Sequence, residues 1–230
     1  MDHPATWQWA LGIPDLWASV VTGLFVMGIL LVLGVRAKAA MATEEAIIPD
    51  AGLTPRNVFE LLVEGIGSLS EQVIGHGSKV YVPTLCTFFI FILTSNLLGL
   101  VPGFIPPTSD FDITLALGIC SFLIFNYYGL KVNGMDYIKH LMGPILALAP
   151  LIFLLELIGV LVRPVSLALR LFGNMSGDHL VLDIFIDLTY LFVPVIFYML
   201  GTLVSVIQAF VFTLLSMIYI GLSVAHDEGH

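Results

Sequence analysis

Charged residues are scarce in this sequence. Of its 230 residues, 11% are Asp, Glu, Lys or Arg and 58% are hydrophobic, whereas soluble domains carry about 25% charged residues. This composition argues against a soluble globular domain. Three runs have no charge over nearly the length of about 20 residues that a bilayer-crossing helix needs. They cover residues 16–35, 82–101 and 113–130, and we expect each of them to span a membrane.

Cysteine is scarcer still. The two copies, Cys86 and Cys120, lie inside the apolar runs and have no CxxC spacing. That arrangement indicates neither a disulfide framework nor a zinc site. We expect both thiols to be small core side chains, and we expect no bound metal.

Lys and Arg are absent from the first 35 residues and from residues 102–112, whose three prolines predict a short external loop. Six of the eight basic residues follow the first or the third run: Arg36, Lys38, Arg56, Lys79, Lys131 and Lys139. Because cytoplasmic loops are enriched in Lys and Arg, the pattern predicts an external N-terminus and, after five crossings, a cytoplasmic C-terminus. No basic residue precedes the first run, so we expect an anchor rather than a removable signal peptide.

Residues 54–79, between the first two runs, have a different pattern. Thr54 followed by Pro55 is typical of a helix start. Apolar residues then recur every three or four positions, opposite Glu60, Glu64 and Glu71. These apolar residues are Val58, Leu62, Ile66, Leu69 and Val73. We expect an amphipathic helix on the cytoplasmic face of the membrane. A helix packed on a soluble partner is the alternative.

Two longer apolar stretches, residues 141–183 and 190–225, complete the chain. Residues 195–225 contain neither proline nor charge, and a helix of that length measures about 46 Å, whereas a bilayer core is about 30 Å thick. Unbroken apolarity favours a tilted crossing. The predicted fold class is thus an all-α polytopic integral membrane protein, with residues 1–230 as a single membrane domain. It has about five membrane-crossing helices and one interfacial helix, and the last two crossings form a long, steeply tilted hairpin.

Arg170 lies in an apolar part of the first long stretch, with apolar neighbours on both flanks. Its guanidinium stays charged, and a charge at that depth costs about 2.5–3.5 kcal/mol and is by default functional. Helical spacing places Ser166 and Asn174 on the same face, whereas Asp178 and Glu156 are about 12 Å and 21 Å away along the axis. Since the first three runs hold no carboxylate, we expect a partner protein to supply the counter-charge. A static ion pair with Asp178 or Glu156 is the alternative.

Asp178, His179, Asp183 and Asp187 follow the arginine. Intramembrane Asp and His chains are typical of proton relays, and we favour this role for Asp178 and His179. An exposed turn is the alternative for Asp183 and Asp187. A hydrolase triad with Ser176 is disfavoured, because Asp178 would point about 100° away from His179 on a helix.

Three further polar residues lie in the long stretches. Gln208 is an amide in an otherwise apolar run and can hydrogen-bond across helices, either in a structural or in a functional role. Arg163 precedes Pro164, and we expect it to extend toward the interface. Glu156 can serve an aqueous entrance from the cytoplasm.

Three segments resemble subunit a of the F-type ATP synthases: TSNLLGLVPG at residues 94–103, PVSLALRLFGNM at 164–175 and IQAFVFTLL at 207–215. The resemblance implies a proton-translocating stator subunit, not an enzyme by itself. It would form two offset half-channels against a rotating ring of c subunits. It also implies one copy per complex, located in a bacterial inner membrane. The implied partners are subunit b of the peripheral stalk and, indirectly, the F1 sector. Neither a cofactor nor a nucleic acid is expected.

The resemblance also assigns roles to residues. Arg170 takes the position of the family's essential arginine, and Asn174 and Gln208 take those of its polar neighbours. Ser166 and Glu156 match positions that flank the cytoplasmic side. Asp178 and His179 match positions that line the external half-channel, and Asp112 matches a position at the mouth of that channel. Many relatives have glutamate in place of His179, and several have a titratable residue in place of Gly201. A secondary ion-coupled transporter is the alternative function, but no internal repeat typical of that class is present.

Overall fold

The computed structural model describes residues 12, 14–41, 54–75, 77–101, 103–135, 137, 149–188 and 192–225. The regular elements within these residues are all helical. They are α2 (Asp15–Met41), α3 (Pro55–Ile74), η2 (Ser78–Val80), α4 (Val82–Leu98), η3 (Pro107–Ser109), α5 (Phe111–Asn133), α7 (Ala149–Leu188) and α8 (Phe192–Val224).

Four of these helices, α2, α5, α7 and α8, are long and apolar enough to cross a membrane, and α4 is a shorter apolar helix. The predicted all-α fold with about five crossing helices is confirmed. The two long C-terminal helices are confirmed as well, with 40 residues in α7 and 33 in α8. The expected start of the first long stretch, residues 141–148, lies outside the described residues.

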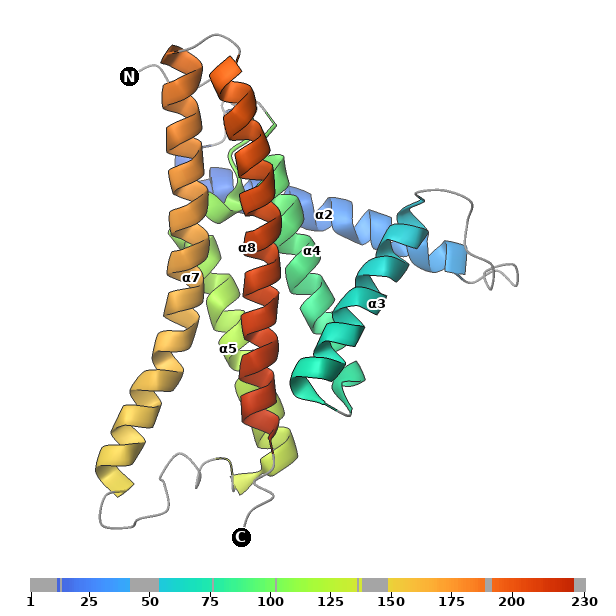
Figure 1. Cartoon of the computed structure of the whole chain (residues 1–230), viewed down its shortest axis with the longest axis vertical. Helices are drawn as coiled ribbons and strands as arrows, with labels where there is room; N and C mark the ends of the chain where they lie inside the picture. The colour runs from blue at the N-terminus through green and yellow to red at the C-terminus, as the bar shows by residue number, and fades with distance from the viewer. Residues whose placement is uncertain are drawn as a thin grey trace.

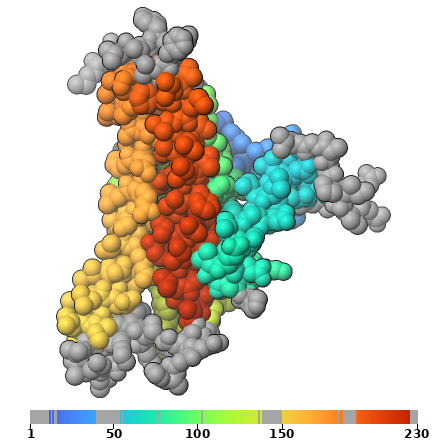
Figure 2. Space-filling view, viewed as in Figure 1, coloured from blue at the N-terminus to red at the C-terminus, as the bar shows by residue number. Residues whose placement is uncertain are grey.

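The helices α7 and α8 run antiparallel and side by side, and α4 and α5 pack behind them (Figure 1). The helix α2 runs across the direction of this bundle and meets α3 at its far end. In the space-filling view, α7 and α8 together form one long continuous face of the molecule (Figure 2). Because α2 lies across α7 and α8, a membrane that α2 crosses along its length would be crossed obliquely by the α7–α8 hairpin. This arrangement agrees with the predicted tilt of the hairpin.

Local chemistry explains where α3 begins and ends. The Thr54 hydroxyl oxygen accepts a hydrogen bond from the Asn57 N–H at 3.4 Å, and Pro55 occupies the first turn. The helix stops at Gly75, whose φ of +95° favours glycine. Within the helix, Arg56 Nε donates to Glu60 Oε1 at 2.8 Å, and Ile66 is buried against the bundle.

Two apolar clusters form the core. One joins α3, α4, α5, α7 and α8 and includes Cys86, as expected for a small core thiol. The other joins α4, α7 and α8 and contains the edge-on ring pair Phe88–Phe212, with centroids 5.5 Å apart. Cys120 is exposed rather than buried. The expectation for it is wrong, because Cys120 lies on a face of α5 that points outward, beside the 44% exposed Ile119.

The turn of residues 103–110, part of the predicted loop, folds back into the bundle. Pro106, Pro107 and Thr108 are buried. Thr108 Oγ1 donates to Asn96 Oδ1 at 2.6 Å, and the 3₁₀ turn η3 contacts α2, α4, α5 and α7. This re-entrant turn (residues 103–110) therefore fills the space where four helices converge.

Candidate functional site

A close contact between α5 and α7 sets the position of Arg170. A Cβ at Gly118 of α5 would lie 2.5 Å from the Pro164 carbonyl oxygen of α7, so only glycine permits this approach. Two residues between Pro164 and Arg170, Leu167 and Ala168, are buried at 2% and 0% exposure. Because they occupy the inward face of α7, Arg170 is directed outward.

The Arg170 side chain is exposed at the surface of the chain. The exposed residues around it are mostly apolar, such as Leu169 at 52% and Val165 at 42% exposure, with the polar Ser166 and Asn174 one turn to either side. Neither a hydrogen bond nor an ion pair joins Arg170 to any residue that the structure describes. The static pair with Asp178 or Glu156, which the sequence left open, is not formed within the described part of the chain. Arg170 is thus a permanent cation on an outward-facing apolar surface.

One turn further along α7, a side-chain hydrogen bond links the two long helices. Asn174 Nδ2 donates to Gln208 Oε1 of α8 at 2.8 Å. Gln208 is 3% exposed, while Asn174 is exposed at the surface. The sequence singled out both residues separately, and the structure brings them together. The pair therefore lies between the surface of Arg170 and the interior of the bundle.

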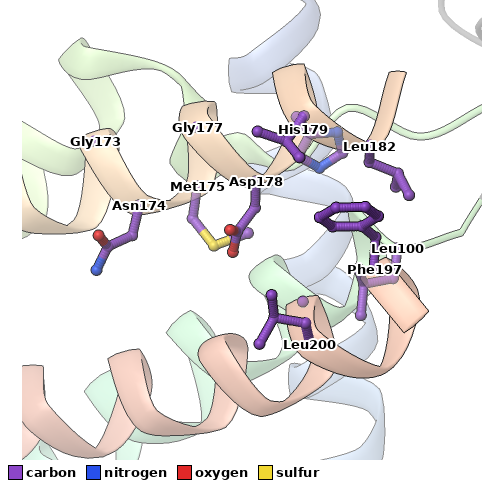
Figure 3. Close-up of a pocket in the computed structure, with 12 residues that line it drawn as sticks. Leu100, Gly173, Asn174, Met175, Gly177, Asp178, His179, Leu182, Phe197 and Leu200 are labelled. Carbon is purple, nitrogen blue, oxygen red and sulfur yellow. The ribbon is translucent and has the colours of Figure 1, made fainter. Parts of the chain in front are cut away.

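A cavity of about 350 Å³ lies beyond this pair, between α7 and α8 near their connected ends. Asn174, Asp178, His179 and Gly201 are among the residues that line it. Figure 3 shows the side chains of Asn174 and Asp178 pointing from α7 toward α8. The cavity thus connects the Asp178–His179 pair with the polar bridge next to Arg170.

The two titratable residues of the cavity are half-buried. Asp178 Oδ2 is buried and has no hydrogen-bond partner among the described residues. The His179 ring lies against α4, because a Cβ placed on Gly99 would be 2.6 Å from His179 Nε2. An unpartnered carboxylate oxygen beside an imidazole in a hollow of this size has the chemistry to exchange protons with water.

The remaining candidate residues lie away from the cavity. Ser166 is exposed one turn before Arg170, and Glu156 is exposed near the start of α7. Asp112 is exposed in the first turn of α5, where its N–H donates to Asp110 Oδ1 at 3.1 Å. Three of the eight candidates therefore line the α7–α8 cavity, a fourth, Gln208, is bonded to one of them, and Arg170 and Ser166 lie on the adjacent outer surface.

Two alternatives for the polar cluster can now be assessed. Asp183 and Asp187 both lie within α7, which continues to Leu188, so neither occupies a turn between helices. Ser176 Oγ donates to the Ser109 carbonyl oxygen of the re-entrant turn at 3.1 Å. This hydroxyl therefore holds the turn against α7 instead of facing His179 as a nucleophile.

Arg163 is held by aromatic rings, a feature that the sequence reasoning missed. Its guanidinium carbon lies 5.2 Å from the Tyr219 ring centroid and 5.9 Å from that of Phe125. Nearby, the Tyr137 hydroxyl donates to Asn126 Oδ1 at 3.0 Å. Burial raises the pKa of Tyr137, and the Arg163 cation partly opposes that rise. Only the presence of aromatic residues in α5 and α8 could have indicated this site.

Comparison with known proteins decides the family. The model of a family described as "ATP synthase A chain" matches residues 16–221, which include every candidate residue named above. The chain belongs to the ATP synthase A chain family.

Curated relatives of the A chain family match most of this chain. "ATP synthase subunit a" of Trichlorobacter lovleyi is 46% identical over 224 residues, which cover 97% of this chain and 94% of the relative. The protein of the same name from Bdellovibrio bacteriovorus is 45% identical over 198 residues, 85% and 86% of the two chains. That of Geobacter sulfurreducens is 43% identical over 213 residues, 93% and 89% of the two chains.

Membership of the A chain family establishes the class of function. This chain is a multi-pass membrane protein and a proton-translocating subunit of the membrane sector of ATP synthase. It works as a channel subunit within that complex and is not catalytic by itself. The alternative function, a secondary ion-coupled transporter, is therefore set aside.

Proposed function

We propose that this chain carries protons through two offset half-channels that meet a rotating ring of c subunits on either side of Arg170. The observation that carries the proposal is the exposure of Arg170, a cation on an apolar outer surface with no anion beside it in the described chain. A charge facing lipid costs about 2.5–3.5 kcal/mol, so the arrangement calls for a carboxylate supplied by a partner.

The fixed cation explains how rotation and proton flow are coupled. A rotor carboxylate is costly as an anion in lipid but is stabilised beside Arg170. It loses its proton into one half-channel, passes the arginine as an anion, and takes a proton from the other half-channel. Because Arg170 cannot give up its own charge, protons do not pass directly between the half-channels. Each transferred charge delivers about 2.3 kcal/mol per 100 mV of membrane potential.

The candidate residues divide between the two half-channels. The cavity with Asp178 and His179, followed by the Asn174–Gln208 bridge, supports an external half-channel that ends beside Arg170. On the cytoplasmic side, Ser166 and Glu156 are exposed along α7. Asp112 would stand near the external mouth, at the start of α5.

The proposed function also predicts the membrane, the orientation and the partner subunits of this chain. The chain would lie in a bacterial inner membrane with its N-terminus outside and its C-terminus in the cytoplasm, as the six basic residues after the first and third spans indicate. One copy would contact the c-ring through the long face of α7 and α8 (Figure 2). Subunit b of the peripheral stalk would hold it, and the F1 sector would be reached only indirectly.

Arg170→Ala tests the proposal directly. In inverted membrane vesicles we expect this variant to lose ATP-driven proton pumping, while passive proton leak persists or rises because the barrier between the half-channels is gone. Arg36→Ala removes another exposed cation, near the end of α2, and serves as the matched control. Coupled pumping retained by Arg170→Ala would refute the mechanism.

The relay roles need a separate test. Replacing Asp178 and His179 together with apolar residues should slow proton uptake from the external side, while the c subunits still co-purify with the chain. Unchanged proton flux would assign both residues to packing.

A further inference from the structure

The apolar core shared by α4, α7 and α8 gives way to a polar layer at one end. This core consists of Phe88, Ile92, Leu167, Leu171, Met175, Ala209 and Phe212. Three residues beyond Ile92 lies Ser95, four residues before Ala209 lies Ser205, and four residues beyond Met175 lies His179. Residues three or four apart share a helix face. The inward face of all three helices therefore becomes polar at the same level.

The register between α4 and α8 places the two serines opposite each other. The ring centroids of Phe88 and Phe212 lie 5.5 Å apart. The helices α4 and α8 run in opposite directions (Figure 1). Ser95 lies seven residues after Phe88, and Ser205 lies seven residues before Phe212. Seven residues are about two turns, so both serines return to the contact face at one level. Both are fully buried, with 0% exposure.

Three buried polar atoms of this layer lack partners. Ser95 Oγ, Asn96 Nδ2 and Ser205 Oγ have no hydrogen bond with any residue that the structure describes. Asn96 Oδ1, in contrast, is occupied by Thr108. Buried polar groups are normally satisfied, and an ordered water with two to four partners satisfies those that other protein groups do not reach. The layer thus presents hydrogen-bond donors and acceptors from α4 and α8 to a water molecule.

The layer lies between two parts of the external half-channel. On one side is Gly99, one turn after Asn96, with His179 Nε2 packed against it. On the other side is Gln208, three residues after Ser205 and bonded to Asn174. A water between the serines would therefore connect the imidazole of the cavity with the amide bridge near Arg170.

We propose that Ser95, Asn96 and Ser205 hold a buried water through which protons pass between the Asp178–His179 cavity and the Asn174–Gln208 bridge. The proposal rests on the proposed function of Asp178 and His179. The water accepts a proton from one side and releases another to the opposite side, so one O–H bond forms as another breaks and nothing is consumed. The serines act as positioning residues, since they hold the water and keep their own protons.

The first test removes both hydroxyl groups. We expect the Ser95→Ala/Ser205→Ala variant to pump protons about two- to tenfold more slowly per assembled complex, which corresponds to the loss of an ordinary hydrogen bond to the water. Thr213→Val is the matched control, because Thr213 is equally buried on α8 and its hydroxyl donates to the Ala209 carbonyl oxygen of its own helix. Equal flux in the double variant and in the wild type would overturn the proposal.

The second test asks whether solvent ions reach the layer, and it does not depend on how well the alanine variant assembles. In a Cys86→Ala/Cys120→Ala background, Ser205→Cys should make proton flux sensitive to silver ions, whereas Thr213→Cys should not. Absence of a silver effect at Ser205→Cys would overturn the proposal. Arg170→Ala, assayed in parallel, separates failure of the proposed function from failure of the buried-water proposal. If Arg170→Ala still pumps protons, the proposed function fails. If Arg170→Ala stops pumping but the serine variants behave as wild type, only the buried-water proposal fails.

Discussion

Gly99→Ala is the sharpest steric test of the site. Gly99 has φ of −65° and ψ of −19°, a conformation that alanine adopts without strain. With no contact in the way, the change would stabilise the fold by about 0.4–1 kcal/mol, because alanine has less freedom in the unfolded chain. The effect of the substitution is therefore decided by what the new methyl group meets.

The new methyl group would meet two side chains. It would lie 2.6 Å from His179 Nε2 and 2.7 Å from both Cβ and Cγ of Pro106, whereas ordinary contacts begin at 3.4 Å. The His179 side chain can turn away from the methyl group, whereas relief of the Pro106 contact requires a small shift of the buried re-entrant turn or of the end of α4. Overpacking of this kind costs about 1–3 kcal/mol. We expect a net destabilisation of about 1–2 kcal/mol and a displaced imidazole.

Two measurements on the purified complex and on inverted vesicles test this reasoning. Gly129→Ala is the matched control, since its methyl group would lie 2.9 Å from Tyr137 Cε2, far along α5 from the cavity. At equal loss of thermal stability, Gly99→Ala should slow proton flux much more than Gly129→Ala does. Adding His179→Ala to Gly99→Ala should recover part of the stability but not the flux. If Gly99→Ala keeps both wild-type stability and wild-type flux, the placement of His179 is wrong.

Three further predictions concern other contacts. In a double-mutant cycle on Asn174→Ala and Gln208→Ala, thermal unfolding should give a coupling energy of about 0.6 kcal/mol, the average for hydrogen bonds between membrane helices. Additive effects of the two substitutions would mean that the residues do not interact. Arg163→Met should lower stability by about 0.5–2 kcal/mol through loss of the aromatic contact, with Arg36→Met as a control that leaves the melting temperature unchanged. Thr108→Val should cost about 1–3 kcal/mol, since it leaves the buried side-chain oxygen Oδ1 of Asn96 unpaired, and wild-type stability of this variant would contradict the buried position of the turn.

The crossing helices and the isolation of Arg170 could be predicted because both depend on local sequence. Charge-free runs give the length of a helix directly, as in residues 195–225. The 3.6-residue period is enough to show that no carboxylate stands beside Arg170 on its own helix. Its outward direction also follows from periodicity once Leu167 and Leu171 are known to face inward.

The missed features all depend on contacts between distant segments. The burial of Pro106, Pro107 and Thr108 requires α2 and α4 to converge on the turn, which no local pattern in residues 102–112 reveals. Arg163 finds its rings on α5 and α8, more than thirty residues away in each direction. Ser95 and Ser205 become neighbours only through the register of two antiparallel helices. The sequence therefore locates polar residues in apolar runs but does not say which of them meet.

The exposure of Arg170 also bears on how the complex is put together. A newly inserted copy of this chain leaves the guanidinium facing lipid, at a cost of about 2.5–3.5 kcal/mol, until an anionic partner covers it. That cost corresponds to a bias of about two orders of magnitude against the unassembled subunit. The residue to which we assign the transport role would thus make an orphan subunit less stable, so we expect surplus copies to be cleared by membrane proteases while assembled copies persist.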